Sequence, residues 1–73
     1  MGYLLVKYQS ERDVFVDDEQ CGKTNDPFET DDGKHKISLG PGDLYRPLMQ
    51  KVVVQGEPYE NPKTIQFVRL QEP

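Results

Sequence analysis

The sequence predicts an all-β fold, a small β-sandwich of about six or seven short antiparallel strands. Six prolines and six glycines divide the 73 residues into short segments. No window carries apolar residues at helical spacing. Short runs rich in β-branched residues lie between turn signals instead, which is the pattern of sandwiches and barrels.

The length is enough for one domain, and we expect residues 1–73 to form a single β-sandwich domain. Only 34% of the residues are apolar and there is no Trp, so the core must be small. A domain of this size has a thin margin of stability. We therefore expect a protein partner, a neighbouring domain or self-association to bury further surface.

The first half contains four strand-like runs, at residues 3–8, 13–16, 19–24 and 28–30. Alternate side chains of a strand share one face. The residues expected in the core on this basis are Leu4, Val6, Tyr8, Val14 and Val16. Asp17-Asp18 is expected to form a tight hairpin turn, because Asp tolerates the left-handed backbone that such turns need.

The second half contains runs at residues 34–39, 44–55 and 64–70, with a loop at residues 40–43. The residues expected in the core are Ile37, Leu39, Ile65 and Phe67, and Val52-Val53-Val54 indicates burial on both faces. Asp31-Asp32-Gly33 is the strongest hairpin-turn signal. Pro47 marks an edge or a bulge, since proline cannot donate to a sheet ladder.

The run at residues 3–8 has only Lys7 to protect it as an edge strand. We expect this strand either to lie inside the sheet or to recruit a partner by strand addition.

A longer pattern runs through the middle of the chain. Val14-Phe15-Val16-Asp17-Asp18-Glu19 is followed by Gly22-Lys23-Thr24 and Pro27, then by Asp32-Gly33-Lys34-His35-Lys36-Ile37-Ser38-Leu39 and by Gly42 to Tyr45. The pattern resembles the signature of PEGA domains over about residues 10–46. The match is partial, because Ser10-Glu11-Arg12-Asp13 stands where the family has Pro-Glu-Gly-Ala. The resemblance implies a Greek-key sandwich of the transthyretin or immunoglobulin kind. It also implies a non-enzymatic accessory module, often found in bacterial surface or multidomain proteins.

Charge is unevenly distributed. The net charge is −4, yet residues 11–33 hold nine acids and two bases, a net charge of −7. A nucleic-acid binder needs clustered Lys and Arg to neutralise phosphates. The sequence has no such cluster, so we expect no nucleic-acid partner. The acidic segment indicates a basic partner or a cation, or only a solvated surface.

Cys21 is the single cysteine, so no internal disulfide can form. A lone thiol favours a reducing compartment such as the cytoplasm. The apolar start is too short for a signal peptide and no run approaches the length of a membrane helix, so we expect no membrane insertion. An extracytoplasmic location follows instead if the chain is part of a larger PEGA-type protein.

The acidic turns are candidate metal ligands. Calcium takes six to eight oxygen ligands from closely spaced carboxylates and carbonyls. The candidate ligands form two groups, Asp17, Asp18 and Glu19 on one turn and Glu29, Asp31 and Asp32 on another. Loops cluster at the ends of a sandwich, so two turns at one end could share an ion. The alternative is that Asp stands in these turns for backbone reasons alone.

Three residues are candidates for protein contacts. Tyr45, Arg46 and Tyr59 lie in or beside proline-containing loops, and Tyr and Arg are enriched at interface hot spots. The alternative is that the tyrosines cover the sandwich ends with their hydroxyls in water.

No catalytic constellation is recognisable. Cys21 and His35 could approach each other if the runs at residues 19–24 and 34–39 were neighbours, but the nearby acids disfavour a thiolate. The same two residues fall short of the four ligands of a structural zinc site. The sequence thus predicts no enzyme and no cofactor. It predicts a non-enzymatic protein-interaction or accessory module, with a calcium- or metal-binding β-module as the alternative.

Overall fold

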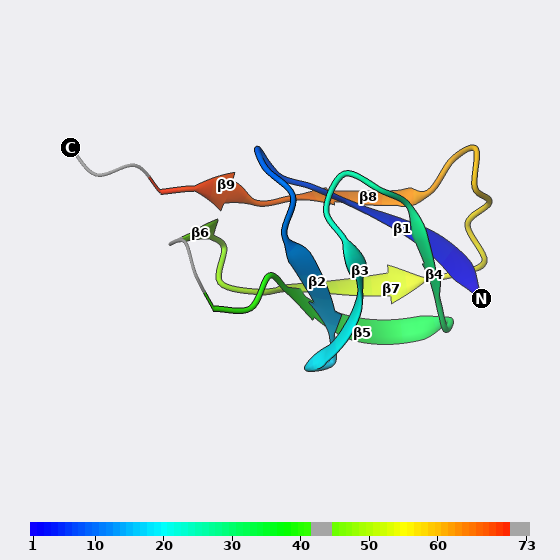
Figure 1. Ribbon diagram of the computed structural model, residues 1–73. Helices are drawn as coiled ribbons and strands as arrows, with labels where there is room; N and C mark the ends of the chain where they lie inside the picture. The colour runs from blue at the N-terminus through cyan, green and yellow to red at the C-terminus, as the bar shows by residue number, and fades with distance from the viewer. Residues whose placement is uncertain (42–44, 71–73) are drawn as a thin grey trace.

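The computed structural model describes residues 1–41 and 45–70, and within these ranges it contains nine strands and no helix. The strands are β1 (Gly2–Lys7), β2 (Asp13–Val16), β3 (Glu19–Lys23), β4 (Phe28–Thr30), β5 (Gly33–Ser38), β6 (Tyr45–Arg46), β7 (Gln50–Val54), β8 (Lys63–Gln66) and β9 (Val68–Arg69). They form the predicted all-β sandwich (Figure 1). Residues 42–44 lie outside the described residues. Part of the loop expected at residues 40–43, the first position of the run at 44–55 and most of the Gly42 to Tyr45 motif therefore lie there too.

The strands form three sheets, in the orders β4-β1-β8, β3-β2-β5-β7 and β6-β9. β1 lies in the middle of its sheet, which confirms the first of the two expectations for this strand. It pairs in parallel with β8, from Leu4 opposite Lys63 to Lys7 opposite Gln66. The other pairings are antiparallel, as predicted.

The core lies between the two larger sheets. The buried apolar residues are Leu4, Val6, Tyr8, Val14, Val16, Ile37, Leu39, Tyr45, Val52, Val54, Ile65 and Phe67. Every core residue predicted from strand alternation, including Ile37 and Leu39, is among them. Val53 is not, and the prediction that all three valines are buried is wrong. Its side chain is 40% exposed, because it points to the face of β7 that lies away from the core.

The two acidic turns differ in kind. Asp17 and Asp18 have φ values of 51° and 70° and join β2 to β3, so the predicted two-residue hairpin turn is confirmed. Asp31-Asp32-Gly33 does not close a hairpin, because β4 pairs with β1 whereas β5 pairs with β2 and β7. This turn instead carries the chain from one sheet to the other.

The strand count exceeds the prediction because of the two shortest elements. β6 is a two-residue strand that ends at Arg46, directly before Pro47, and Phe67 separates β8 from β9. The main-chain N–H of Phe67 donates to the carbonyl of Lys7 at 2.9 Å, which is the last bond between β1 and this segment. β6 and β9 pair to form a ribbon at one end of the molecule, and the N-terminus lies at the other end (Figure 1).

Candidate functional site

The three predicted contact residues do not meet. Tyr45 is 7% exposed, and its hydroxyl accepts the main-chain N–H of Leu39 at 3.1 Å. The expectation that Tyr45 is accessible on a loop is therefore corrected: it lies on β6 with its ring turned into the core. Arg46 is exposed on the same strand. Tyr59 is 60% exposed and packs edge-to-face on Tyr3 of β1 with the ring centroids 5.3 Å apart. The loop between β7 and β8, which carries Tyr59, lies at the other end of the molecule from the β6–β9 ribbon (Figure 1).

The β2–β3 turn is bonded to β5. Oδ2 of Asp17 lies 2.7 Å from Nδ1 of His35, and Oδ1 of Asp17 accepts the main-chain N–H of Lys36 at 2.9 Å. The Lys36 ammonium lies 3.0 Å from the Asp18 carboxylate. On its other side, Nε2 of His35 lies 2.7 Å from the carbonyl oxygen of Asp31. His35 therefore stands between the two acidic turns.

This geometry favours the imidazolium form of His35. Each ring nitrogen faces an oxygen acceptor, and only the protonated ring can donate from both nitrogens. The hydrogen bond to Asp17 raises the pKa of His35 above 6.5, against a smaller opposing effect of desolvation. The same bond lowers the pKa of Asp17 below 3.8.

The acidic turns form no ion-binding cage in the part of the chain that the structure describes. There, no group of three or more His, Cys, Asp or Glu residues is placed to hold a metal ion. Asp17 and Asp18 face the cations on β5. Asp32 accepts the main-chain N–H of Gly56 at 2.9 Å. The calcium hypothesis for Asp17, Asp18, Glu19, Glu29, Asp31 and Asp32 stays a prediction.

Cys21 and His35 are not neighbours. β2 lies between β3, which carries Cys21, and β5, which carries His35. The expectation that these two strands could lie side by side is therefore wrong. Cys21 is exposed and free.

Exposed apolar side chains gather at the end of the molecule that carries the β6–β9 ribbon. We call four of them the apolar end: Leu48, Met49, Val68 and Leu70, with exposed fractions of 74%, 45%, 58% and 40%. Leu48, Met49 and Leu70 line one shallow pocket together with Tyr45, Arg46 and Pro47. Val68 lies opposite Arg46 in the ribbon.

The apolar end was not among the sites predicted from the sequence, although one signal was available. Ile65 and Phe67 face the core, so strand alternation places Val68 and Leu70 off that face. No comparable signal marks Leu48 and Met49, because they directly follow Pro47 in a run whose faces were not assigned at these positions.

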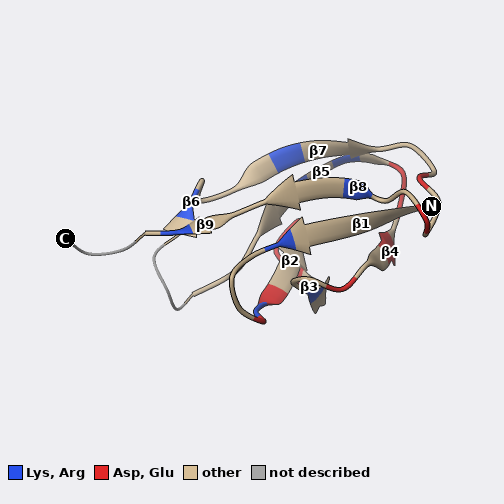
Figure 2. Ribbon diagram, turned by 90° about the horizontal axis from the view of Figure 1, so that it is seen from above, with Lys and Arg blue, Asp and Glu red and all other residues tan. Residues whose placement is uncertain are grey.

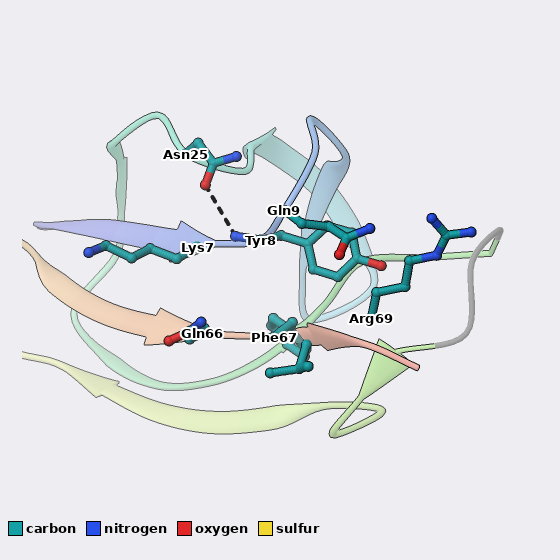
Figure 3. A pocket seen from close by; sticks show the side chains of 8 residues that line it. Lys7, Tyr8, Gln9, Asn25, Gln66, Phe67 and Arg69 are labelled. Carbon is teal, nitrogen blue, oxygen red and sulfur yellow. Dashed lines mark hydrogen bonds between the residues drawn. The ribbon is translucent and has the colours of Figure 1, made fainter. Parts of the chain in front are cut away.

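A second surface lies beside the end of β1, where the chain passes from β8 into β9. This groove, which we call the β9 groove, has a volume of about 370 Å³ (Figure 3). Its polar walls are formed by Lys7, Gln9, Asn25, Gln66 and Arg69, beside Val68 and over the buried rings of Tyr8 and Phe67. Oδ1 of Asn25 accepts the main-chain N–H of Tyr8 at 3.1 Å, which fixes one wall (Figure 3).

The charges are segregated along the fold. Figure 2 shows acidic residues around β2, β3 and β4, whereas β6, β7, β8 and β9 carry basic residues. The apolar end and the β9 groove therefore lie on the basic side of an acidic protein. Within the described residues, neither Arg46 nor Arg69 has a carboxylate in ion-pair contact.

No known protein family, curated protein or solved structure matches this chain. The described residues contain no helix with the length and hydropathy needed to cross a bilayer. The fold and its surfaces define a small all-β domain whose candidate sites are surface contacts.

Proposed function

We propose that this chain is a non-enzymatic protein-interaction module that binds its partner through the apolar end. The observation that carries the proposal is the gathering of Leu48, Met49, Val68 and Leu70, each at least 40% exposed, around one end of the molecule. Contiguous exposed apolar surface with a polar rim is typical of interaction sites. The resemblance to PEGA domains, which implies an accessory module, supports the same proposal.

The surroundings of the apolar end indicate the chemistry of the partner. Arg46 lies directly opposite Val68 in the ribbon and shares its face, so this cation borders the apolar side chains. Arg69 lies opposite Tyr45 and therefore on the other face. Arg is enriched at the centre of interfaces, where its planar group binds carboxylates with two parallel hydrogen bonds. The partner therefore presents apolar side chains beside Asp or Glu.

Aromatic packing holds the β6–β9 ribbon against the core. Tyr45 packs edge-to-face on Phe67 and on Tyr8, with ring centroids 5.5 Å and 6.5 Å away. Aromatic pairs of this geometry contribute about 0.5–1.5 kcal/mol beyond their burial. The strands that carry the apolar end are therefore held in place before binding, which lowers the conformational entropy lost when a partner binds.

The arrangement of the reactive groups supports a non-enzymatic role. Catalysis by a thiol needs a base within hydrogen-bond reach. β2 separates Cys21 from His35, and both ring nitrogens of His35 already face Asp17 and Asp31.

Photo-crosslinking tests the proposal. A photoreactive residue placed at position 48 is expected to give one discrete adduct with a partner protein in cells of the source organism. The same residue at position 53, on the exposed face of β7, is the matched control and is expected to give none. The partner, once purified, should bind the Leu48→Ser protein at least about tenfold more weakly than the parent protein.

Equal crosslinking at positions 48 and 53 would contradict the proposal, as would an adduct that is only a dimer of this chain. Unchanged affinity of the purified partner for the Leu48→Ser protein would contradict it too.

A further inference from the structure

The β9 groove contains an unfilled strand position. β8 runs beside β1 as far as Gln66, and the bond from Phe67 N–H to the Lys7 carbonyl is the last contact of that ladder. Beyond Lys7 the chain bends away toward β2, while β9 continues outward beside β6 alone (Figure 1). One long edge of β9 therefore has no strand beside it among the described residues.

The backbone of Arg69 faces this open edge. Backbone groups of successive strand residues point to opposite sides of the strand. The N–H of Phe67 points toward the β1 side, so the N–H and C=O of Arg69 point to that side as well. The backbone groups of Val68 point the other way, toward Arg46 on β6. A guest strand in the groove would thus find one donor and one acceptor on Arg69.

A guest strand would also complete a weak element. Isolated two-stranded ribbons have marginal stability in water, and a third strand adds both hydrogen bonds and side-chain contacts. The β6–β9 ribbon is such a two-stranded sheet.

The groove has the charge and the donors for an acidic guest. Lys7 and Arg69 stand on its walls, and among its lining residues in the described chain there is no Asp or Glu. The amides of Gln9 and Gln66 add neutral donors and acceptors. Within the described residues the buried hydroxyl of Tyr8 has no hydrogen-bond partner, and in Figure 3 it points toward the side of the groove where Arg69 lies.

We propose that the β9 groove binds an extended acidic segment of a partner protein by strand addition along the open edge of β9. Main-chain bonds to Arg69 hold the segment, and Lys7 and Arg69 bind its Asp or Glu side chains. A second copy of β9 is the wrong guest, because it would place Arg69 against Arg69 and like charges disfavour pairing. The inference rests on the proposed function in that both assign a protein partner to this end of the molecule. The groove and the apolar end have Val68 in common, but Leu48, Met49 and Leu70 lie outside the groove.

A titration with a model peptide tests the inference. The probe is a capped heptapeptide, Thr-Val-Glu-Val-Glu-Val-Thr, added to the isotope-labelled protein while amide NMR shifts are followed. We expect saturable shifts centred on residues 7–9 and 67–70, with a dissociation constant below about 1 mM. The matched peptide with Gln in place of Glu should bind at least about fivefold more weakly, and added salt should weaken binding of the Glu peptide.

Two variants separate the backbone contribution from the charge. Arg69→Gln removes the cation and keeps the N–H, so it should weaken binding of the Glu peptide to a level between that of the parent protein and that of the Gln peptide. Arg69→Pro removes the N–H as well and should abolish binding. Proline is tolerated at a sheet edge where the N–H faces outward, and the amide spectrum checks the fold. Should that variant not fold, Lys7→Gln supplies the second measurement, with the same expected loss as Arg69→Gln.

Several results would overturn the inference: no saturable shift at about 5 mM peptide, shifts centred on β3 or β7, or equal affinity for the Glu and Gln peptides. The Leu48→Ser protein should bind the peptide as well as the parent does. Loss of peptide binding with a retained crosslink at position 48 would remove this inference and leave the proposed function intact.

Discussion

Nδ1 of His35 lies 2.7 Å from the carboxylate of Asp17, and this contact joins the β2–β3 turn to the middle of β5. The side chain of His35 is only 13% exposed, whereas that of Asp17 is 54% exposed.

The first prediction is a loss of stability as pH rises through neutrality. The pKa of His35 is raised above 6.5 in the folded protein, so its contribution is complete below pH 6.5 and is lost as pH rises through the folded value. The pKa of Asp17 is lowered below 3.8, so its contribution is present above pH 3.8 and is lost as pH falls through the folded value. The pair stabilises the fold most between these limits.

Thermal unfolding followed by circular dichroism from about pH 5 to pH 8 checks this prediction. The parent protein should show a falling Tm across the upper part of the range, and His35→Gln should show a flatter profile. Asp13→Asn removes an ion pair with Lys23 at 2.9 Å on another part of the surface and should keep the parent slope. Equal slopes for the parent and His35→Gln would show that the contact does not titrate in this range.

The second prediction concerns Gly22, which lies on β3. A Cβ at this position would lie 2.6 Å from the Phe28 ring, closer than real Cβ contacts allow. Gly22→Ala should therefore displace the ring and destabilise the protein by about 1–3 kcal/mol. Urea unfolding measures the change. Cys21→Ala, at an exposed neighbouring position, should stay within about 0.5 kcal/mol of the parent, and a similar value for Gly22→Ala would mean that the ring moves aside at no cost.

The third prediction compares two buried tyrosine hydroxyls. Within the described residues the hydroxyl of Tyr8 has no partner, so Tyr8→Phe should leave stability unchanged or raise it by up to about 1 kcal/mol. The hydroxyl of Tyr45 accepts the main-chain N–H of Leu39, so Tyr45→Phe leaves a buried donor unpaired and should cost about 1–3 kcal/mol. Chemical unfolding of both variants gives the comparison. A loss for Tyr8→Phe as large as that for Tyr45→Phe would mean that a bound water or another group satisfies Tyr8.

Local patterns predicted the strands and their inward faces well. Alternation of side chains is a property of a single strand, so Leu4 and Val6 could be assigned to the core without knowledge of their neighbours. The turn at Asp17-Asp18 was predictable for a similar reason, since its positive φ values depend on the residues of the turn itself.

Pairing between distant strands was not predictable in this way. Nothing in the sequence of β1 or β8 specifies that the two run in parallel, because the partner of a strand is chosen by the packing of the whole sandwich. The same limit explains the error at Asp31-Asp32-Gly33, where a good hairpin signal joins strands that lie in different sheets. It also explains Val53, since three consecutive valines do not reveal which face of the sheet is covered.

For the candidate sites too, features within one strand or turn could be predicted, whereas contacts between distant segments could not. The sequence placed the acids on two turns, but it could not show that His35 stands between them, because that contact joins residues 18 positions apart. The apolar end and the β9 groove depend on where β1 stops relative to β9, which is a relationship between strands. Arg46 was identified from its residue type and its place beside Pro47. Tyr45 was assigned to the surface by the same argument, and only the fold reveals that its ring is buried.

The fourth prediction separates the apolar end from the core. Leu4 is fully buried in the middle of its sheet, whereas Leu48 is 74% exposed. Leu4→Ala should cost about 2–5 kcal/mol, through lost burial and the cavity left behind. Leu48→Ala should stay within about 0.5 kcal/mol of the parent, because its side chain contributes little burial to the folded state. Urea unfolding of both variants under the same conditions is the measurement. A cost for Leu48→Ala above about 1.5 kcal/mol would mean that Leu48 supports the fold. The proposal that the apolar end binds a partner protein would then lose its main observation.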